Sequence, residues 1–466
     1  MSTMDTKDVS STKETIGRAG GKALRKEVPR STHGGWSAAA DRPDPVDLIT
    51  SQNESRIQFL VPIRHWRMAQ TPFTFYRGAA KVMASDLATT PATGLNAQLC
   101  GDAHLSNFGA YGSAARELVF DVNDFDETLP GPWEWDLKRL AASFAIAARN
   151  NNYKSRHEAD LAARSVASYR SAMARFAGMH YLDVWYSHLR VEDIEAAFAD
   201  QLTKKQRKSG TKWANKARSK NSVHALKKLA EETDDGYRIV SQPPLIVPLR
   251  DIPTKQDPDD IKRHVTEQFE QYNDTVPDHL GVLLGRFGYR DLALKVVGVG
   301  SVGTNCDVVL LEGRDGSEPF FLQIKEAMDS VLADHLPASR YEHQGERVVV
   351  GQRMMQAASD MFLGWTTGAT GKFYYWRQFK DMKGSVEVDG APLTQMQLYA
   401  QVCGWTLARA HARSGDSQAI AGYLGKGDVF DKAIADFAVA YADQNDADYK
   451  VFKTAIDSGK IDAEEG

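Results

Sequence analysis

Apolar and polar residues alternate with two different periods along this chain, and the period changes from one part to the next. The residues from Leu137 to Ala148 are strong helix formers, and helical character continues over roughly residues 156–232. Along 397–413 apolar side chains recur every three or four residues, which predicts an amphipathic helix. These segments indicate that much of the chain is helical.

Strands are predicted in two places. In the first, residues 98–100 and 118–122 are predicted to form short, mostly apolar strands, and the earlier one leads into a Gly-Asp turn. In the second, residues 293–325 alternate like a β-meander. The elements expected from there on are strands at 294–297, 306–311 and 320–325, a turn at 313–316, a helix at about 340–362 and a strand at 373–379.

These patterns divide the chain into four parts. Residues 1–45 are polar, rich in Ser, Thr, Lys and Arg, and we expect them to form a disordered arm. Residues 46–290 form a mostly helical part that holds the first two strands, and residues 291–395 form a β-rich part. The last part, residues 396–466, is expected to be helical and to pack on the first helical part. The predicted fold class is therefore α+β.

Composition and charge narrow the class of protein only slightly. The chain has 466 residues, of which 42% are hydrophobic and 25% charged, and its net charge of -4 argues against a general binder of polyanions. The three cysteines, Cys100, Cys306 and Cys403, suggest neither a disulfide framework nor a metal site. Because no secretory signal and no run of 18 apolar residues occur, we expect a cytoplasmic protein without membrane spans.

The most informative polar residues follow the first predicted strand. Asp102 and Asn107 stand five positions apart, and Asp124 follows after a short apolar stretch. Phosphoryl transfer needs one carboxylate to orient the attacking hydroxyl, and an amide with a second carboxylate to hold Mg²⁺ against the nucleotide phosphates. We expect Asp102 to accept the substrate proton and Asn107 and Asp124 to bind Mg²⁺, with Asp121 or Asp126 able to share the metal. Asp and Asn also form turns, although carboxylates crowded this closely repel one another without a cation.

A Gly-x-Gly-x-x-Gly run that begins at Gly298 is a second candidate for phosphate binding. By itself the run is ambiguous, because dinucleotide-binding folds and kinases both use it. A dinucleotide fold requires a helix directly after the glycines, whereas residues 304–311 predict a strand. The pattern therefore favours a kinase-like hairpin in which Gly298, Gly300, Ser301 and Gly303 cover the phosphates. A glycine-rich turn without a ligand is the alternative.

Lys325 ends the third strand of the predicted meander. Strand alternation places it on the face opposite Phe320 and Ile324. A lysine in this place can reach the α- and β-phosphates of a nucleotide, and a carboxylate of the next helix, Glu346 or Glu342, is expected to pair with it. The alternative is an exposed lysine at the end of a strand.

These motifs resemble those of a known group of enzymes. Gly101-Asp102, His104 and Asn107, followed by Asp124-Phe125-Asp126, resemble the signature of the aminoglycoside phosphotransferase and choline kinase group of protein-kinase-like folds. The register extends to Asp136-Leu137, since that group also opens a helix with Asp-Leu after its metal aspartate. This resemblance implies a two-lobe protein-kinase-like fold with extra helices.

Roughly residues 45–450 also resemble an uncharacterised bacterial family, domain of unknown function 2252. The segments that carry this second resemblance are Pro72–Gly78, Cys100–His104, the Gly298 loop, Gln323–Glu326 and Ala408–Arg413. This family brings no established reaction with it.

Two departures from the kinase pattern stand out. The histidine that usually precedes Gly-Asp is Cys100 here, and the glycine loop follows the aspartate motifs, although a kinase has the reverse order. Circular permutation would explain this order, because chain termini lie at the surface and often close together. The helix at 397–413 agrees with it, since in that group such a helix directly precedes the Asp loop. His411 with Asp416 offers a competing loop, but Ala421 stands where Asn is required.

Two further features have ambiguous roles. Residues 204–220 hold eight Lys or Arg residues around Trp213, and a solvated helical face is favoured over a site for an acidic substrate or a nucleic acid. Arg77, beside Gly78, can clamp a phosphate or a carboxylate, or it can hold loops to the core.

The sequence thus predicts an ATP- and Mg²⁺-dependent phosphotransferase that acts on a hydroxyl of a small molecule or a protein. A nucleotide-binding pseudokinase with a regulatory or scaffold role is the first alternative, because Cys100 replaces the histidine and nothing identifies the acceptor. Transfer of AMP by the same residues is the second, and the strand after Gly303 disfavours a nicotinamide enzyme. We expect neither a membrane nor a nucleic acid among the partners.

Overall fold

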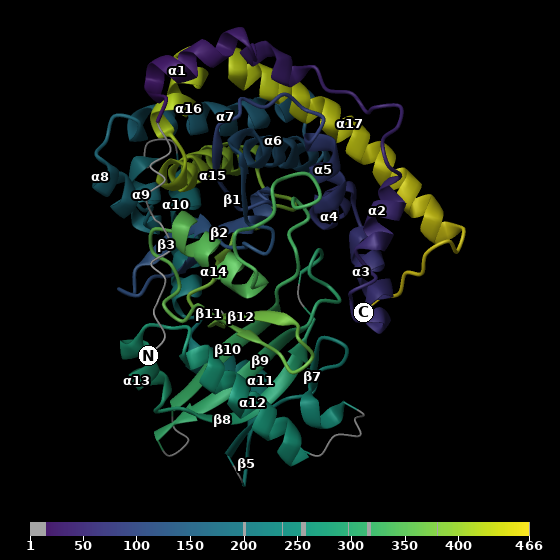
Figure 1. The fold of residues 1–466 in the computed structure, drawn as a ribbon, viewed down its shortest axis with the longest axis vertical. Helices are drawn as coiled ribbons and strands as arrows, with labels where there is room; N and C mark the ends of the chain where they lie inside the picture. Colours follow the sequence, from purple (N-terminus) through teal and green to yellow (C-terminus); the bar gives the residue numbers. More distant parts are fainter. Residues whose placement is uncertain are drawn as a thin grey trace.

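The computed structural model describes residues 15–198, 202–234, 236–252, 258–296, 298–314, 318–379 and 381–465. It is a mixed α+β protein, as the sequence predicts. In Figure 1 the longest helices gather at one end of the molecule, the larger sheet lies at the other end, and the small sheets formed by residues 96–132 lie between them.

The larger sheet of the described chain has six antiparallel strands in the order β11-β12-β10-β9-β8-β7. In chain order they are β7 (Ile246–Pro248), β8 (Gly288–Lys295), β9 (Cys306–Gly313), β10 (Glu318–Glu326), β11 (Gly364–Thr367) and β12 (Phe373–Gln378).

Helices cover both faces of this sheet. Ile324 of β10 joins a buried cluster with α12 (Pro258–Asn273) and α13 (Asp278–Leu284), whereas Phe321 packs with α11 (Ser222–Leu229) on the opposite face. The alternation predicted for this strand is therefore confirmed, and Lys325 lies on the face of Phe321.

Four long helices form the core of the other end of the described chain. They are α6 (Trp133–Asn150), α7 (Arg156–Phe176), α15 (Leu393–Ser414) and α17 (Val429–Asp457). All residues of α6 from Trp133 to Ala148 are buried, because its many alanines let neighbouring helices approach from every side. Where α15 crosses α7, a Cβ at Gly404 would lie 2.0 Å from the Ser165 carbonyl oxygen, so glycine permits the close crossing.

The remaining helices are shorter and surround this core and the sheets. They are α1 (Gly17–Ala23), α2 (Pro45–Ser51), α3 (Val61–Met68), α4 (Pro72–Gly78), α5 (Ala80–Leu87), α8 (Tyr181–Tyr186), α9 (Val191–Ala197), α10 (Lys204–Arg218), α14 (Gln344–Met355) and α16 (Ser417–Leu424). The helical character predicted over 156–232 is thus divided among α7 to α11. The helix predicted at about 340–362 is α14, which ends earlier because the chain turns back into β11.

Small sheets complete the structure, and those formed by residues 96–132 lie between the two ends of the molecule, whereas residues 230–239 pair beside the larger sheet. The antiparallel strands β2 (Phe108–Gly112) and β3 (Leu118–Val122) form a hairpin, and β13 (Gly384–Ser385), which follows β12 by a short crossover, adds to it. The other two pairs are β1 (Asn96–Leu99) with β4 (Leu129–Pro132), and β5 (Ala230–Thr233) with β6 (Gly236–Ile239). Because β1 and β3 lead into the Asp102 and Asp124 segments, these strands set the positions of the candidate residues.

The polar arm predicted for residues 1–45 is not what the structure shows in its described part. From Gly17 onward the chain forms α1, which packs on α16, and a Cβ at Gly21 would lie 1.9 Å from the Ala419 carbonyl oxygen. Arg25 and Arg30 donate hydrogen bonds to carbonyl groups at the C-terminal end of α16. The basic residues that suggested an arm therefore satisfy a helix end. The first 14 residues lie outside the described part.

Two other predictions fall partly outside the described residues. They concern Val297 of the strand at 294–297 and Asp315 and Gly316 of the turn at 313–316. Within the described ranges, the helices are too short or too polar to span a membrane.

Candidate active site

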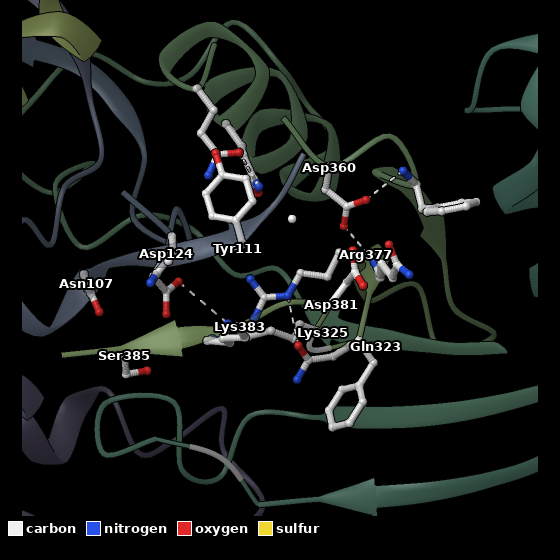
Figure 2. A pocket seen from close by; sticks show the side chains of 18 of the residues that line it. Asn107, Tyr111, Asp124, Gln323, Lys325, Asp360, Arg377, Asp381, Lys383 and Ser385 are labelled. Carbon is white, nitrogen blue, oxygen red and sulfur yellow. Dashed lines mark hydrogen bonds and ion pairs between the residues drawn. The ribbon is translucent and has the colours of Figure 1, made fainter. Parts of the chain in front are cut away.

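Two cavities meet where the larger sheet faces the β13-β2-β3 sheet. The larger one has a volume of about 560 Å³ and is lined by residues of β2, β10 and β12, and Figure 2 shows Asp124 and Lys325 among its side chains. The smaller one, of about 70 Å³, lies beside the glycine loop and is lined by Asp102. Arg77, Asp124 and Ser301 line both cavities and mark the junction between them.

The turn that carries Asp102 is held by hydrogen bonds on both sides. The Asp136 carboxylate, at the start of α6, accepts the backbone N–H groups of Cys100 and Gly101 at 2.8 and 3.0 Å. The Asn107 side-chain amide donates to the backbone carbonyl of Asp102 at 2.8 Å. Gly101 has a φ of +83°, and a Cβ there would lie 2.2 Å from a facing backbone oxygen, so the turn requires glycine.

The Asp102 carboxylate forms an ion pair with Arg139, which comes from the same helix as Asp136. Two Arg139 nitrogens lie 2.6 and 2.7 Å from one Asp102 oxygen. Burial raises the pKa of the Asp102 carboxyl, but Arg139 outweighs burial and holds this pKa below its usual value. His104 lies 3.7 Å from the other oxygen and is neutral, because burial lowers its pKa to about 3. Asp102 is therefore ionised and fixed in orientation.

Lys325 joins the larger sheet to the aspartates of the helical part. Its ammonium lies 3.8 Å from Asp124 Oδ1 and 2.5 Å from Asp126 Oδ2, and the Tyr375 hydroxyl donates to the other Asp126 oxygen at 2.6 Å. Burial lowers the pKa of Lys325, but the two carboxylates outweigh burial and raise it well above its usual value. Lys325 is only 2% exposed, so the alternative of an exposed strand lysine is wrong.

The two aspartates beside Lys325 differ in their electrostatic environment. Burial and the neighbouring Asp126 raise the pKa of the Asp124 carboxyl, and Lys325 only partly opposes them. For Asp126, burial raises the pKa, but the closer Lys325 outweighs it and the pKa is lowered. Both Asp126 oxygens are engaged by Lys325 and Tyr375, whereas Asp124 lies on the larger cavity with the weaker cationic partner.

Glu346 does not pair with Lys325 as the sequence predicted. The ion pairs that Lys325 forms within the described ranges are with two aspartates, and the other proposed partner, Glu342, is exposed. The residue of α14 that turns toward this region is Arg347, which donates to the backbone carbonyl of Asp126 at 2.9 Å. Helix α14 therefore supports the loop that holds Asp126, and this loop supplies the carboxylate that pairs with Lys325.

The glycine run connects β8 to β9, so the strand–loop–strand hairpin that the sequence predicts is present. Gly298 and Gly303 have φ values of +70° and +90°, which residues with side chains rarely adopt. Arg67 of α3 donates to the Gly298 carbonyl at 2.9 Å and anchors the loop to the helical part. Gly298 and Ser301 line the larger cavity, and Gly300 and Ser301 line the smaller one.

The side chains at the larger cavity offer oxygen atoms of the kind that Mg²⁺ prefers, but too few to surround the ion without other ligands. Asn107 and Asp124 both line this cavity, and Mg²⁺ usually takes one or two protein oxygens together with waters and substrate phosphates. Asp121, the other carboxylate considered for the metal, is buried in an ion pair with Arg409. Among the described residues, no group of three or more His, Cys, Asp or Glu side chains is arranged to hold a metal ion.

Some residues of the site were not found from the sequence. Arg139 stands three positions after Asp136, so both project from one face of α6 toward the Asp102 turn, and this spacing could have revealed it. Tyr375 and Arg377 come from β12, which pairs with β10, and only the strand register places them beside Lys325. Arg377 donates to the Gln323 side chain at 2.9 Å and lines the larger cavity.

The competing loop of His411 and Asp416 has a different place in the structure. Asp416 is the N-cap of α16 and accepts the Ala419 N–H at 2.9 Å. His411 is buried, 3.3 Å from the Asp136 carboxylate and within hydrogen-bond distance of Tyr169. These residues support the core and the Asp102 turn.

The basic segment at 204–220 contains α10, whose lysines are exposed, as expected for a solvated face. Trp213 on its opposite side donates to the Ser385 carbonyl of β13 at 2.9 Å. This helix thus packs beside the strand that borders the larger cavity.

One comparison with known proteins gives a match. A family described as an uncharacterized protein conserved in bacteria (DUF2252) matches residues 56–455, which include every candidate residue named above. No curated protein and no solved structure matches the chain. The family match confirms the second resemblance found in the sequence, and the chemistry has to be inferred from the geometry of the site.

Proposed function

We propose that the chain, which belongs to the DUF2252 family of bacterial proteins, is an ATP- and Mg²⁺-dependent phosphotransferase. One observation carries this proposal. Lys325 and Asp124 are remote in sequence, yet they lie 3.8 Å apart on a cavity that Asn107 and Gly298 also line. A buried cation, metal-binding oxygens and a glycine loop around one cavity suit a nucleoside triphosphate. The volume of about 560 Å³ lies within the range of small-molecule sites.

Each residue has a role in the proposed reaction. Lys325 and the glycine loop bind the nucleotide phosphates, and Asn107 and Asp124 hold Mg²⁺, which when bound neutralises phosphate charge. Asp102 orients the hydroxyl of the acceptor, a small molecule or a protein, and receives its proton as the oxygen attacks phosphorus. The ion pair with Arg139 keeps the Asp102 carboxylate in one orientation before the acceptor binds.

The fold that we propose is a two-lobe protein-kinase-like fold in circularly permuted order. The larger sheet with Lys325 would form one lobe, and the helical part with Asp102 the other. The placement of α15 supports permutation: the Gln98 N–H of β1 donates to the Ser414 hydroxyl at 2.9 Å across 316 positions. The helix therefore ends beside the strand that enters the Asp102 turn, where an unpermuted chain would continue directly.

A nucleotide-binding pseudokinase is the second candidate. The ion pair of Asp102 with Arg139 favours it, because a lowered pKa makes the carboxylate a weak base. Transfer of AMP would use the same residues with the nucleotide reversed. These alternatives share the nucleotide and differ in the product.

Nucleotide binding to the full chain tests the proposal. We expect titration calorimetry to show ATP binding that depends on Mg²⁺ and weakens at least tenfold in Lys325→Met, because the phosphates lose their buried cation. The matched control is Lys372→Met, which removes a more exposed lysine that pairs with Glu326 near the same sheet.

Products then separate the candidates. Mass spectrometry of cell extract incubated with the protein and ATP should find phosphorylated products. Adenylylated products would indicate AMP transfer, and binding without turnover would indicate the pseudokinase. Absence of ATP binding at millimolar concentration would contradict the proposal.

A further inference from the structure

Arg77 is a cation without a partner at the centre of the site. It lies in the last turn of α4 and is one of the three residues that line both cavities. Its Nε is buried without a hydrogen-bond partner, and within the described ranges its guanidinium forms no ion pair. The residue as a whole is half-buried and lines both cavities, whereas its buried Nε–H is unfavourable unless a ligand supplies an acceptor.

Arg56, Arg64 and Arg409 also have a buried Nε without a partner, but each donates at least one hydrogen bond through a terminal nitrogen. Arg139 pairs with Asp102, and Arg409 with Asp121. Arg64 donates to Asn53 and to a backbone carbonyl, and Arg347 donates to three backbone carbonyls. Among the described arginines whose Nε is buried without a partner, Arg77 is the one that makes no hydrogen bond or ion pair through its other nitrogens either.

The surroundings of Arg77 indicate which kind of ligand would satisfy it. The glycine loop passes directly over its backbone, since a Cβ at Gly300 would lie 3.3 Å from the Arg77 carbonyl oxygen. Asp124, a proposed metal ligand, lines the same junction, and Asp102 lines only the smaller cavity. A group that moves from a nucleotide in the larger cavity to an acceptor beside Asp102 must pass this junction.

We propose that Arg77 binds the terminal phosphate of the nucleotide, the group that is transferred. This inference rests on the proposed function and adds a residue that stabilises the phosphoryl group in transit. The planar guanidinium presents two parallel N–H groups to two phosphate oxygens, which a lysine cannot do. Burial lowers the pKa of Arg77, and the carboxylates of Asp102, Asp389 and Asp124 only partly oppose it. The group stays charged, so a phosphate that displaces water from it gains strong hydrogen bonds.

Binding of ATP, ADP and AMP with Mg²⁺ to the full chain tests this role. We expect the wild-type protein to bind ATP more tightly than ADP, and Arg77→Gln to lose at least tenfold in ATP affinity while ADP affinity changes less than threefold. Arg77→Lys should recover only part of the loss. The control is Arg353→Gln, which removes a half-buried arginine of α14 outside both cavities. Equal ATP-to-ADP ratios in the wild type and Arg77→Gln would overturn the inference.

Inorganic pyrophosphate separates failure of this inference from failure of the proposed function. If the wild-type protein binds no nucleotide, the proposed function fails. Thermal stabilisation of the wild-type protein by pyrophosphate would still show whether an anion binds at the junction. Stabilisation that disappears in Arg77→Gln but persists in Arg353→Gln supports an anion site at Arg77. No stabilisation, or stabilisation that is equal in both variants, overturns it. The melting temperature of each variant without ligand shows that it is folded.

Discussion

The two sides of the candidate site differ in how their charges are balanced. On the Asp102 side, the carboxylate pairs with Arg139, and Asp136 accepts two backbone N–H groups of the turn. On the side of the glycine loop, Arg77 has no hydrogen-bond or ion-pair partner among the described residues, and Asp124 lies 3.8 Å from Lys325. The first side is complete in the protein alone, whereas the second leaves charges for a ligand to satisfy.

This difference shows where the energy of ligand binding would be used. A paired and hydrogen-bonded carboxylate needs no rearrangement before reaction, which favours catalysis by orientation. An unpaired guanidinium and a weakly paired carboxylate destabilise the protein without ligand, and a phosphate with its metal ion would relieve both. The comparison therefore makes opposite predictions for substitutions on the two sides.

The largest effect is expected for Asp102→Asn. The amide keeps much of the shape of the turn but cannot accept the acceptor proton, so turnover should fall by about 10³-fold. ATP affinity should change less than threefold, because the proposed nucleotide site lies on the other side of the junction. Mass spectrometry of the product checks the expected loss of turnover, and calorimetry checks the expected ATP affinity. Unchanged turnover would remove Asp102 from the mechanism.

Stability should respond very differently to the loss of two arginines. Arg139→Met leaves Asp102 buried without its cation and should lower the free energy of unfolding by about 3 to 5 kcal/mol. Arg77→Met removes an unpaired charge and should change it by less than about 1 kcal/mol, or raise it. Urea unfolding of the protein without ligand measures both. Similar losses in the two variants would show that Arg77 has a stabilising partner and would break the comparison.

The sequence indicated which residues line the two cavities better than it indicated how they pair. Asp102, Asn107, Asp124 and Lys325 were found because phosphoryl transfer restricts the residue types and, for the first two, the spacing. Those choices are local. Whether Lys325 lies next to the aspartates depends on how the larger sheet packs against the helical part, which no local sequence pattern specifies.

The wrong partner for Lys325 illustrates this limit. Glu346 follows Lys325 in the next helix and was the natural choice, but Asp126, 199 positions away, takes the place. Both are carboxylates of suitable reach, so the sequence alone cannot rank them. The same holds for the first helix: the glycines that let α1 approach α16 have no visible partner until both helices are placed.

A smaller effect is expected for Asp124→Asn. Removing the charge of this proposed metal ligand should weaken Mg²⁺-dependent ATP binding by about 10- to 100-fold, while the affinity for ATP without Mg²⁺ should change little. Because burial and Asp126 raise the pKa of Asp124, Mg²⁺-dependent binding of the wild type should fall as the pH is lowered, before ordinary carboxyls protonate. Calorimetry with and without Mg²⁺ checks this. Equal losses in both conditions would assign Asp124 to another task.

The smallest effect concerns Glu127, which lines the smaller cavity. Burial, together with Asp126 and Asp102, raises its pKa from 4.5 to about 7, although the Val331 N–H donates to it at 2.7 Å. Between these two values the folded protein holds a proton that the unfolded chain has lost, so stability should fall as the pH rises from about 4.5 to 7.

Glu127→Gln keeps an acceptor for Val331 and stays neutral at every pH. The wild type should lose stability between pH 4 and pH 8, and the variant should not. The free energy of unfolding of the variant minus that of the wild type should therefore be about 1 to 3 kcal/mol higher at pH 8 than at pH 4, since one unit of pKa corresponds to about 1.4 kcal/mol. Urea unfolding at both pH values measures the difference, with Glu117→Gln, at a more exposed carboxylate, as the control. A difference that does not change with pH would mean that Glu127 is already balanced by cations. The charge imbalance would then be confined to Arg77 and Asp124.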